Sequence, residues 1–168
     1  MATEIERKFL IRLPDFEAIP KCRVQAMTQT YLNILPDDPG LERRVRWIAE
    51  NGQNRFVYTE KRSISSGTAA VRQEDEWEIS AEEYADKLAE AFSQLTKVRH
   101  SFPYAGHIVE IDVYPYDIGG DAMVGLAVME IEMADENEEI QLPPFLEVLR
   151  ELTGTREFSN KALAKRVR

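Results

Sequence analysis

The chain has 168 residues, a length that suits one domain with its own core and leaves little room for a second catalytic module. Hydrophobic residues make up 43% and charged residues 30%, which is typical of a folded globular protein and excludes disordered, collagen-like and fibrous chains. Because 30 acidic residues outweigh 21 basic ones, the formal net charge is −9. This charge disfavours duplex nucleic acid or an anionic membrane surface as a partner of the whole molecule.

Apolar stretches stay far below the ~20 residues that a membrane-spanning helix requires, and Met1–Leu10 is charged where a secretion signal would be apolar. We therefore expect a cytoplasmic protein with no membrane partner. Cys22 is the only cysteine and there are only two histidines, which excludes an internal disulfide, a thiolate cluster and a histidine-rich zinc site. A metal site in this chain would have to be built from carboxylates.

Eight segments show the alternation of residue types that predicts β-strands. They are Glu4–Ile11, Gln25–Asn33, Glu42–Ala49, Arg55–Arg62, Val71–Ile79, Lys97–Tyr104, Ile108–Tyr114 and Leu126–Met133. Turn residues such as Asn51-Gly52 and Ala105-Gly106 separate most of them and favour antiparallel hairpins. The segment Pro115–Gly125 is longer than a tight hairpin needs, and we expect a surface loop there. No linker divides the sequence, so residues 1–168 are expected to form one domain.

Three helices are expected between and after the strands. Ser80 and Glu83 form a capping box, which opens an apolar helical face that extends to Leu95. A second helix is predicted over Pro143–Gly154, with proline at its start and glycine past its end. A third, shorter helix is expected to follow Ser159.

Charged residues recur at every second position of these strands, and residues at i and i+2 lie on the same face of a sheet. The opposite face of most strands is apolar, as at Val45 and Trp47. On a single strand, a charged face usually only meets water. Repeated on seven strands, with few helices to cover a sheet, it predicts an α+β fold built on an eight-stranded antiparallel β-barrel, whose charged face points into the lumen.

The inward positions include eight acids and eight bases. The acids are Glu4, Glu6, Glu74, Glu76, Glu110, Asp112, Glu130 and Glu132, and the bases are Lys8, Arg44, Arg46, Lys61, Arg72, Lys97, Arg99 and Lys161. Such a lumen must hold an ionic ligand, because buried charge without a partner is very costly. Arginine and lysine suit phosphate oxygens, and clustered carboxylates suit Mg²⁺ or Mn²⁺. The sequence therefore predicts binding of a polyphosphate together with a divalent cation.

The same residues form an ordered set of motifs that resembles one known family. The motifs are Glu4-Ile-Glu-Arg-Lys8, Gln29-Thr-Tyr31-Leu32, Arg44-Val-Arg46, Thr59-Glu-Lys61, Arg72-Gln-Glu74-Asp-Glu76, Lys97-Val-Arg99, Glu110-Ile-Asp112, Glu130-Ile-Glu132 and Asn160-Lys161. Together they resemble the CYTH superfamily of triphosphate tunnel metalloenzymes over residues 4–161. The resemblance implies a tunnel-shaped barrel and metal-dependent chemistry on triphosphates, and the family includes inorganic triphosphatases, thiamine triphosphatases, RNA triphosphatases and class IV adenylyl cyclases.

The resemblance also implies roles for individual residues. All eight lumen acids named above would be metal ligands, with Glu4, Glu6, Glu130 and Glu132 as the core of the set, for one or two Mg²⁺ or Mn²⁺ ions. All eight lumen bases would bind phosphate. Lys8, Tyr31, Lys61 and Glu76 would take part in catalysis, with Tyr31 assisting Lys61.

The expected activity is hydrolysis of a short linear triphosphate, first of all inorganic tripolyphosphate, to pyrophosphate and phosphate. Two enzymatic alternatives remain open from the sequence: a thiamine triphosphatase, and an adenylyl cyclase that converts ATP to cyclic AMP. A third alternative is a polyphosphate- or nucleotide-binding module without turnover. An apolar outer face of the barrel also predicts a homodimer.

Overall fold

The computed structural model describes residues 2–66, 69–114 and 124–167. Its strands are β1 (Ala2–Arg12), β2 (Arg23–Leu32), β3 (Glu42–Glu50), β4 (Gln53–Ser66), β5 (Ala70–Ile79), β6 (Ala91–Tyr104), β7 (His107–Val113), β8 (Leu126–Glu132), β9 (Val148–Glu151) and β10 (Lys165–Arg166). Its helices are α1 (Ala81–Lys87), the 3₁₀ turn η1 (Leu88–Glu90) and α2 (Asn160–Leu163). Residues 115–123 of the expected loop Pro115–Gly125 lie outside the described residues.

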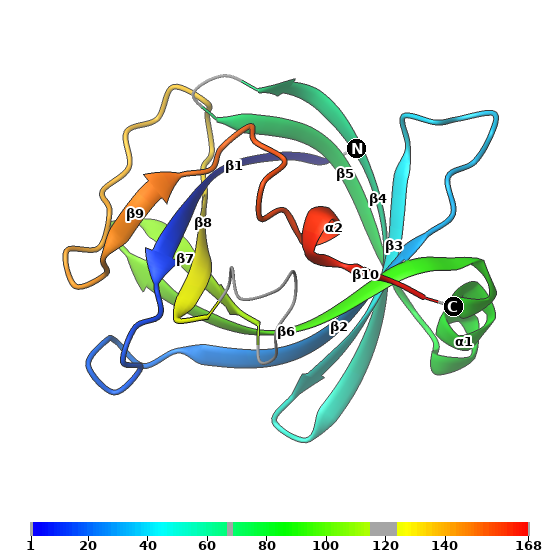
Figure 1. Ribbon diagram of the computed structural model, residues 1–168, viewed down its shortest axis with the longest axis horizontal. Coiled ribbons are helices and arrows are strands. Elements are labelled where there is room, and N and C mark those ends of the chain that lie inside the picture. The colour runs from blue at the N-terminus through cyan, green and yellow to red at the C-terminus, as the bar shows by residue number, and fades with distance from the viewer. Residues whose placement is uncertain (1, 67–68, 115–123, 168) are drawn as a thin grey trace.

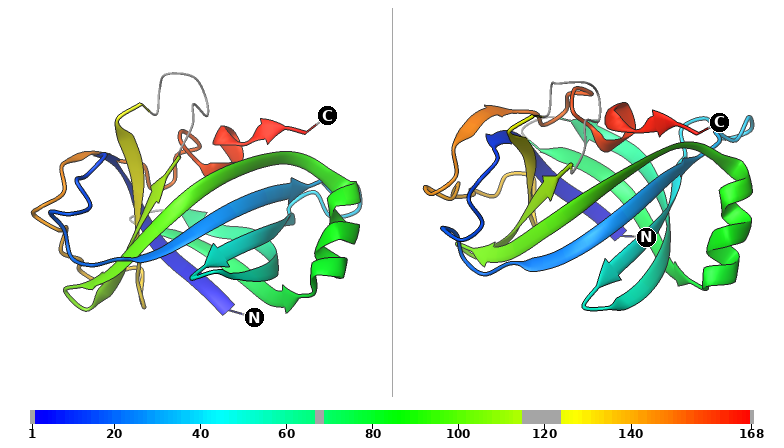
Figure 2. Two further views of the ribbon diagram at one scale, coloured as in Figure 1. Left: turned by 90° about the horizontal axis from the view of Figure 1, so that it is seen from below. Right: turned by 60° about the horizontal axis from the view of Figure 1, so that its bottom comes forward.

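The sheet closes on itself as an eight-stranded antiparallel barrel, which confirms the predicted α+β barrel fold. The strands follow one another in the order β6-β2-β3-β4-β5-β1-β8-β7, and β7 pairs with β6 to complete the ring. β9 adds to β1 and β10 adds to β6 outside this ring. Figure 1 looks along the barrel and shows α2 in front of the ring of strands, while α1 lies outside it. Figure 2 places α2 and β10 at one end of the barrel and the N-terminus at the other.

The main apolar core lies outside the barrel wall, on the outer face of β1, β6, β7 and β8. Phe9, Ile111, Met129 and Ile131 point outward there and are fully buried. The covering layer is made by connecting segments and β9, through Phe16, Ile19, Cys22, Ile140, Leu146 and Val148. The expected apolar outer face therefore exists, and on this side the chain's own loops cover it.

The predicted helix over Pro143–Gly154 is wrong, because Val148–Glu151 form β9 and the rest of the segment is not helical. β1 pairs with β5 only over Ala2–Glu6, which leaves the backbone groups of Phe9–Ile11 unpaired on that edge. β9 pairs with these residues, and Leu152 N donates to Lys8 O at 2.7 Å. Satisfying buried backbone groups outweighs the local helical pattern.

The helix predicted from Ser80 to Leu95 is shorter than expected. Ser80 caps α1 as predicted, accepting from Glu83 N at 3.0 Å, but the helical part ends at Glu90. Ala91 begins β6, whose pairing with β2 places Leu95 on the lumen side opposite Gln29. The third helix is also short: α2 spans Asn160–Leu163, with Ser159 as its N-cap. None of the described helices is long and apolar enough to cross a membrane.

The position of the core outside the barrel predicts unequal effects of two equivalent substitutions on β7. Ile111 is 0% exposed and Ile108 is 49% exposed. We expect Ile111→Ala to lower the free energy of unfolding by about 2–5 kcal/mol because it leaves a cavity. Ile108→Ala should change it by no more than about 0.5 kcal/mol. Urea unfolding of the two variants measures this, and equal losses would contradict the placement of the core.

Candidate functional site

The barrel lumen contains a cavity of about 940 Å³, which we call the lumen cavity. It extends from Ala2 and Thr3 at the start of β1 to Ser159 and Lys161 at α2, so it runs between the two ends of the barrel. Among the residues that the structure describes, equal numbers of acids and bases line it: Glu4, Glu6, Glu42, Glu74, Glu76, Glu110, Glu130 and Glu132, with Lys8, Arg44, Arg46, Lys61, Arg72, Arg99, Arg156 and Lys161. The lumen is therefore ionic, as its strand faces predicted.

Strand register brings these charges together. Residues that lie directly opposite each other in neighbouring strands project to the same face. Glu6 lies opposite Glu132, Lys8 opposite Glu130, Glu4 opposite Arg72 and Lys61 opposite Glu74. Residues from strands far apart in the sequence thus meet inside one barrel.

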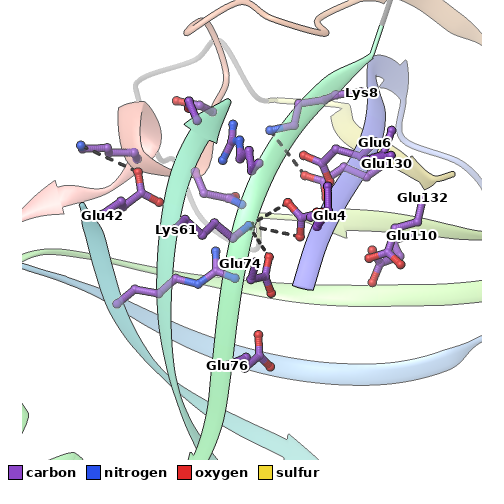
Figure 3. Close-up of a pocket in the computed structure, with 18 of the residues that line it drawn as sticks. Glu4, Glu6, Lys8, Glu42, Lys61, Glu74, Glu76, Glu110, Glu130 and Glu132 are labelled. Atoms are coloured by element: carbon purple, nitrogen blue, oxygen red, sulfur yellow. Dashed lines mark hydrogen bonds and ion pairs between the residues drawn. The ribbon is translucent and has the colours of Figure 1, made fainter. Parts of the chain in front are cut away.

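Lys61 lies between two carboxylates at the centre of the cavity. Its Nζ is 3.0 Å from Glu4 Oε1 and 3.1 Å from Glu74 Oε2 (Figure 3). Nearby, Arg46 Nη2 donates to Glu76 at 3.2 Å, and Thr59 Oγ1 also donates to Glu76. These contacts tie β1, β3, β4 and β5 together through charge.

Two pairs of carboxylates stand close enough to compete for protons. Burial and a hydrogen bond with Glu74 raise the pKa of Glu4, although Lys61 opposes the shift. Burial and the charge of Glu130 raise the pKa of Glu6 well above its usual range. Burial acts in the same direction on Glu130, but Lys8 and Arg99 outweigh it and hold that pKa well below its usual range. A divalent cation would reduce the repulsion between such crowded carboxylates, and their oxygen atoms are suitable ligands for it.

The carboxylates of Glu110 and Glu132 add to this crowding. Burial raises the pKa of Glu110 to about 7, against the influence of Arg99, whose Nη1 lies 2.9 Å from it. Burial and the charge of Glu4 raise the pKa of Glu132. Figure 3 shows these two side chains beside each other, on the side of the cavity that also carries Glu6 and Glu130. Negative charge is thus concentrated on β1, β7 and β8.

The opposite wall presents arginines with unused donors. The Nε atoms of Arg44 and Arg46 are buried and have no hydrogen-bond partner among the described residues. Burial and the charge of Arg44 lower the pKa of Arg46 to about 10, so both groups are cationic at neutral pH. Two like charges with unsatisfied donors side by side are stabilised by an anion that accepts from both.

Tyr31 lies at the α2 end of this wall. Its hydroxyl accepts a hydrogen bond from Gln29 Nε2 at 2.6 Å, and burial raises its pKa to about 12. Tyr31 is therefore protonated at neutral pH and can donate a hydrogen bond into the lumen cavity, which it lines.

Lys97 and Asp112 do not line the lumen cavity, unlike the other acids and bases singled out from the sequence. Each is 1% exposed, and Lys97 Nζ lies 2.7 Å from Asp112 Oδ2. Arg99 also donates to Asp112, at 2.8 Å, and Arg99 does line the cavity. Arg99 and Lys97 hold the pKa of Asp112 at about 2 despite its burial. The pair thus supports Arg99 from behind.

Several lining residues were not singled out from the sequence. Glu42 and Ser63 share the strand faces of Arg44 and Lys61, so the alternation of residues already pointed to them. Glu42 also lies 3.8 Å from Lys161, which links β3 to α2. Arg156 lies in an irregular segment, and no sequence pattern places it in the lumen.

A closed barrel with an ionic lumen of this kind defines a tunnel-type fold. A model of the CYTH domain matches residues 2–165, and the chain belongs to the CYTH domain family. The structure of the PH1819 protein from Pyrococcus horikoshii OT3 is similar to this one, with 19% sequence identity and a TM-score of 0.62. The aligned region covers 80% of each chain. HpAC1 from Hippeastrum, described as a candidate adenylyl cyclase with a dominant triphosphatase activity, is 17% identical over 79% of this chain and 80% of its own, with a TM-score of 0.55. These two structures share the fold. No curated protein matches the sequence.

The burial of Asp112 predicts a structural role for its charge. Asp112→Asn leaves Lys97 and Arg99 without their shared anion, and we expect a loss of about 3–5 kcal/mol in the free energy of unfolding at pH 7. Glu132→Gln, the same change at an exposed lumen carboxylate, should leave stability nearly unchanged. Urea unfolding in EDTA compares the two variants. A mild effect of Asp112→Asn would show that its ion pairs do not hold the lumen together.

The raised pKa of Glu110 predicts a pH dependence of stability without metal. Between pH 4.5 and about 7, Glu110 is protonated in the folded protein and ionised in the unfolded chain. The contribution of Glu110 to the free energy of unfolding is therefore fully present below pH 4.5 and is lost as the pH rises through about 7. The shift corresponds to at most about 3 kcal/mol. Glu110→Gln should flatten this fall in unfolding measurements made in EDTA. An unchanged slope would contradict the assignment.

Proposed function

We propose that this protein is a divalent-metal-dependent triphosphatase that hydrolyses a short linear triphosphate inside the barrel. Inorganic tripolyphosphate is the substrate that we favour. The observation that carries the proposal is the pairing of opposite walls in one cavity. The buried Nε donors of Arg44 and Arg46 have no acceptor among the residues described by the structure, and the facing strands bring together carboxylates whose ionisation is disfavoured by burial. A triphosphate with a divalent cation satisfies both walls at once. The triphosphatase activity described for HpAC1, which shares the fold, supports this choice.

The bases of the lumen cavity would bind the phosphates. Arg44, Arg46 and Arg72 line the wall formed by β3, β4 and β5, where planar guanidinium groups match pairs of phosphate oxygens. Lys8, Arg99 and Lys161 reach the cavity from β1, β6 and α2, so the chain of phosphates would be surrounded by cations. Lys97 would act through Arg99 by holding Asp112 in place.

The residues present fit a divalent cation, although no group of three or more acidic, histidine or cysteine side chains in the described ranges is already arranged around one point. Glu4, Glu6, Glu130 and Glu132 would hold it, with Glu74, Glu76 and Glu110 nearby. All are hard oxygen donors of the kind Mg²⁺ and Mn²⁺ prefer. When bound, such an ion neutralises phosphate charge and lowers the pKa of water.

The chain's own side chains would then guide the transfer. Burial opposes ionisation of Glu76, but Arg46 outweighs it and lowers the pKa, so Glu76 is a carboxylate that can accept a proton from water. The water oxygen forms a bond to the terminal phosphorus, and the bond between that phosphorus and the bridging oxygen breaks. The electron pair leaves with pyrophosphate. Lys61, Lys8 and the hydroxyl of Tyr31 donate hydrogen bonds to the oxygens that gain charge.

Association of two copies is also part of the proposal. Loops cover the outer face of β1, β6, β7 and β8, but the outer face of β3 and β5 leaves Trp47 and Trp77 at 43% and 48% exposure. Half-exposed tryptophans are enriched where subunits meet. Light scattering at working concentration tests this association, and a monomer would remove it.

Two substitutions separate the roles of the two walls. Glu132→Gln should lower kcat at least about a hundredfold while tripolyphosphate still binds, because it removes a ligand of the cation but no phosphate contact. Arg46→Ala should chiefly weaken binding, raising KM about tenfold or more, because it removes a buried donor. Steady-state kinetics distinguish the two patterns. Turnover of Glu132→Gln equal to that of the unmodified protein would contradict the assignment of Glu132.

Product analysis tests the activity itself. The purified protein is incubated with tripolyphosphate, ATP or thiamine triphosphate, each with Mg²⁺, Mn²⁺ or EDTA, and products are separated by chromatography, with Glu4→Gln as the blank. Pyrophosphate and phosphate from tripolyphosphate, formed only with metal, are the expected result. Cyclic AMP from ATP would instead identify a cyclase. Binding of triphosphates without any product would identify a binding module.

A further inference from the structure

Arg156 lines the lumen cavity from a segment that is not part of any barrel strand. Figure 1 shows this segment leading from β9 to α2 at the opening of the barrel. The guanidinium group of Arg156 has no hydrogen-bond or ion-pair partner among the described residues. Lys161, at the same end of the cavity, instead lies 3.8 Å from Glu42. The donors of Arg156 are therefore available to a ligand.

The backbone around Arg156 is held in one conformation. Ser159 N donates to Arg156 O at 3.2 Å, which closes a turn. Phe158 within this turn has a φ of 57°, a left-handed conformation that a bulky residue rarely adopts. Its ring packs against the cluster that contains Tyr31 and Leu163, and such packing is what maintains an unfavourable backbone angle. The turn is therefore a fixed part of the cavity wall.

Arg150 of β9 holds the same turn from the outside. Its Nη2 lies 2.5 Å from Glu157 Oε1, and its guanidinium group lies 5.6 Å from the centre of the Phe158 ring. The ion pair is half exposed, so it contributes little to the free energy of unfolding. Its consequence is geometric, because Glu157 is drawn toward Arg150 while the neighbouring Arg156 lines the cavity.

Arg156 enters the cavity at a distance from the arginines of β3. Arg44 and Arg46 project to the same face of β3, where a ligand with two phosphates can accept from both Nε atoms. The segment of Arg156 adjoins β1 instead, since Lys8 N donates to Thr153 Oγ1 at 2.9 Å. β4 and β5 separate β3 from β1 in the sheet. A third phosphate is therefore needed to contact Arg156 as well.

We propose that Arg156 binds the third phosphate of the ligand and selects a triphosphate over a diphosphate. Arg150 is the positioning residue that keeps Arg156 directed into the lumen cavity. This inference rests on the proposed function and adds to it a residue that determines chain-length specificity. The planar guanidinium group donates two hydrogen bonds to oxygens of one phosphate, which a lysine in its place cannot reproduce.

Calorimetric titration in EDTA tests this proposal with tripolyphosphate and pyrophosphate as the two ligands. The variants are Arg156→Ala, Arg156→Lys, Arg150→Ala and the double variant Arg150→Ala/Arg156→Ala. Arg55→Ala is the matched control, because Arg55 is also exposed and carries the same charge but does not line the lumen cavity. Thermal unfolding verifies that each variant is folded, and hydrolysis of tripolyphosphate is measured separately with Mg²⁺ or Mn²⁺.

We expect Arg156→Ala to bind tripolyphosphate about five- to tenfold more weakly and pyrophosphate less than twofold more weakly. Arg156→Lys should recover only part of the loss. Arg150→Ala should weaken tripolyphosphate binding about threefold, with no further loss when Arg156 is already alanine, because it acts through that side chain. Arg55→Ala should change the affinity for either ligand less than twofold.

Several outcomes would overturn the proposal. Equal losses for the two ligands in Arg156→Ala, no loss, or no binding of tripolyphosphate by the unmodified protein would each do so. Additive losses in the double variant would refute the positioning role of Arg150. A loss selective for tripolyphosphate, in a protein that hydrolyses none of it with either metal, would retain the role of Arg156 and refute the triphosphatase activity.

Discussion

The cost of enclosing charge inside a barrel governs this molecule. Eight acids and eight bases of the described residues line one cavity, where their charged groups lose contact with water. Part of that cost is offset within the chain, where Lys61 lies between Glu4 and Glu74, and Asp112 between Lys97 and Arg99. The rest is not offset: burial raises the pKa of Glu6 and Glu110, and the Nε atoms of Arg44 and Arg46 find no acceptor in the described part of the chain. These unsatisfied groups of both signs are the basis for the proposal that the lumen binds a cation together with an anion.

The fold provides this lumen because the strands carry their core on the other side. Phe9, Ile111 and Met129 point outward and pack under loops and β9, so the inner face is free to be polar. Two apolar clusters also lie inside the barrel. At α2, Leu163 packs on Tyr31 and Leu95, and a second cluster consists of Met27, Ile48 and Val57. Apolar clusters thus flank the charged lining, and the lower local dielectric beside them strengthens the nearby electrostatic interactions.

Strand alternation was enough to predict the barrel and nearly all of its ionic lining, because a period of two fixes which side chains share a face. It could not distinguish a residue that lines the cavity from one that is buried on the same face of the sheet. Lys97 and Asp112 have the same parity as Arg99 and Glu110, and only their mutual pairing at 2.7 Å shows that they are buried supports. Local patterns also failed where long-range pairing decides. Val148–Glu151 has a helical pattern but pairs with the edge of β1, and Phe92 has a helical pattern but belongs to β6.

The most direct test of a lumen that binds triphosphate and cation together is a crystal structure with tripolyphosphate and Mn²⁺, using the anomalous signal of manganese. We predict an anomalous peak in contact with carboxylates of Glu4, Glu6, Glu130 or Glu132, and phosphate oxygens within hydrogen-bonding distance of the guanidinium groups of Arg44 and Arg46. Manganese and tripolyphosphate bound only at the outer surface of the barrel, with the lumen unchanged, would contradict the central claim.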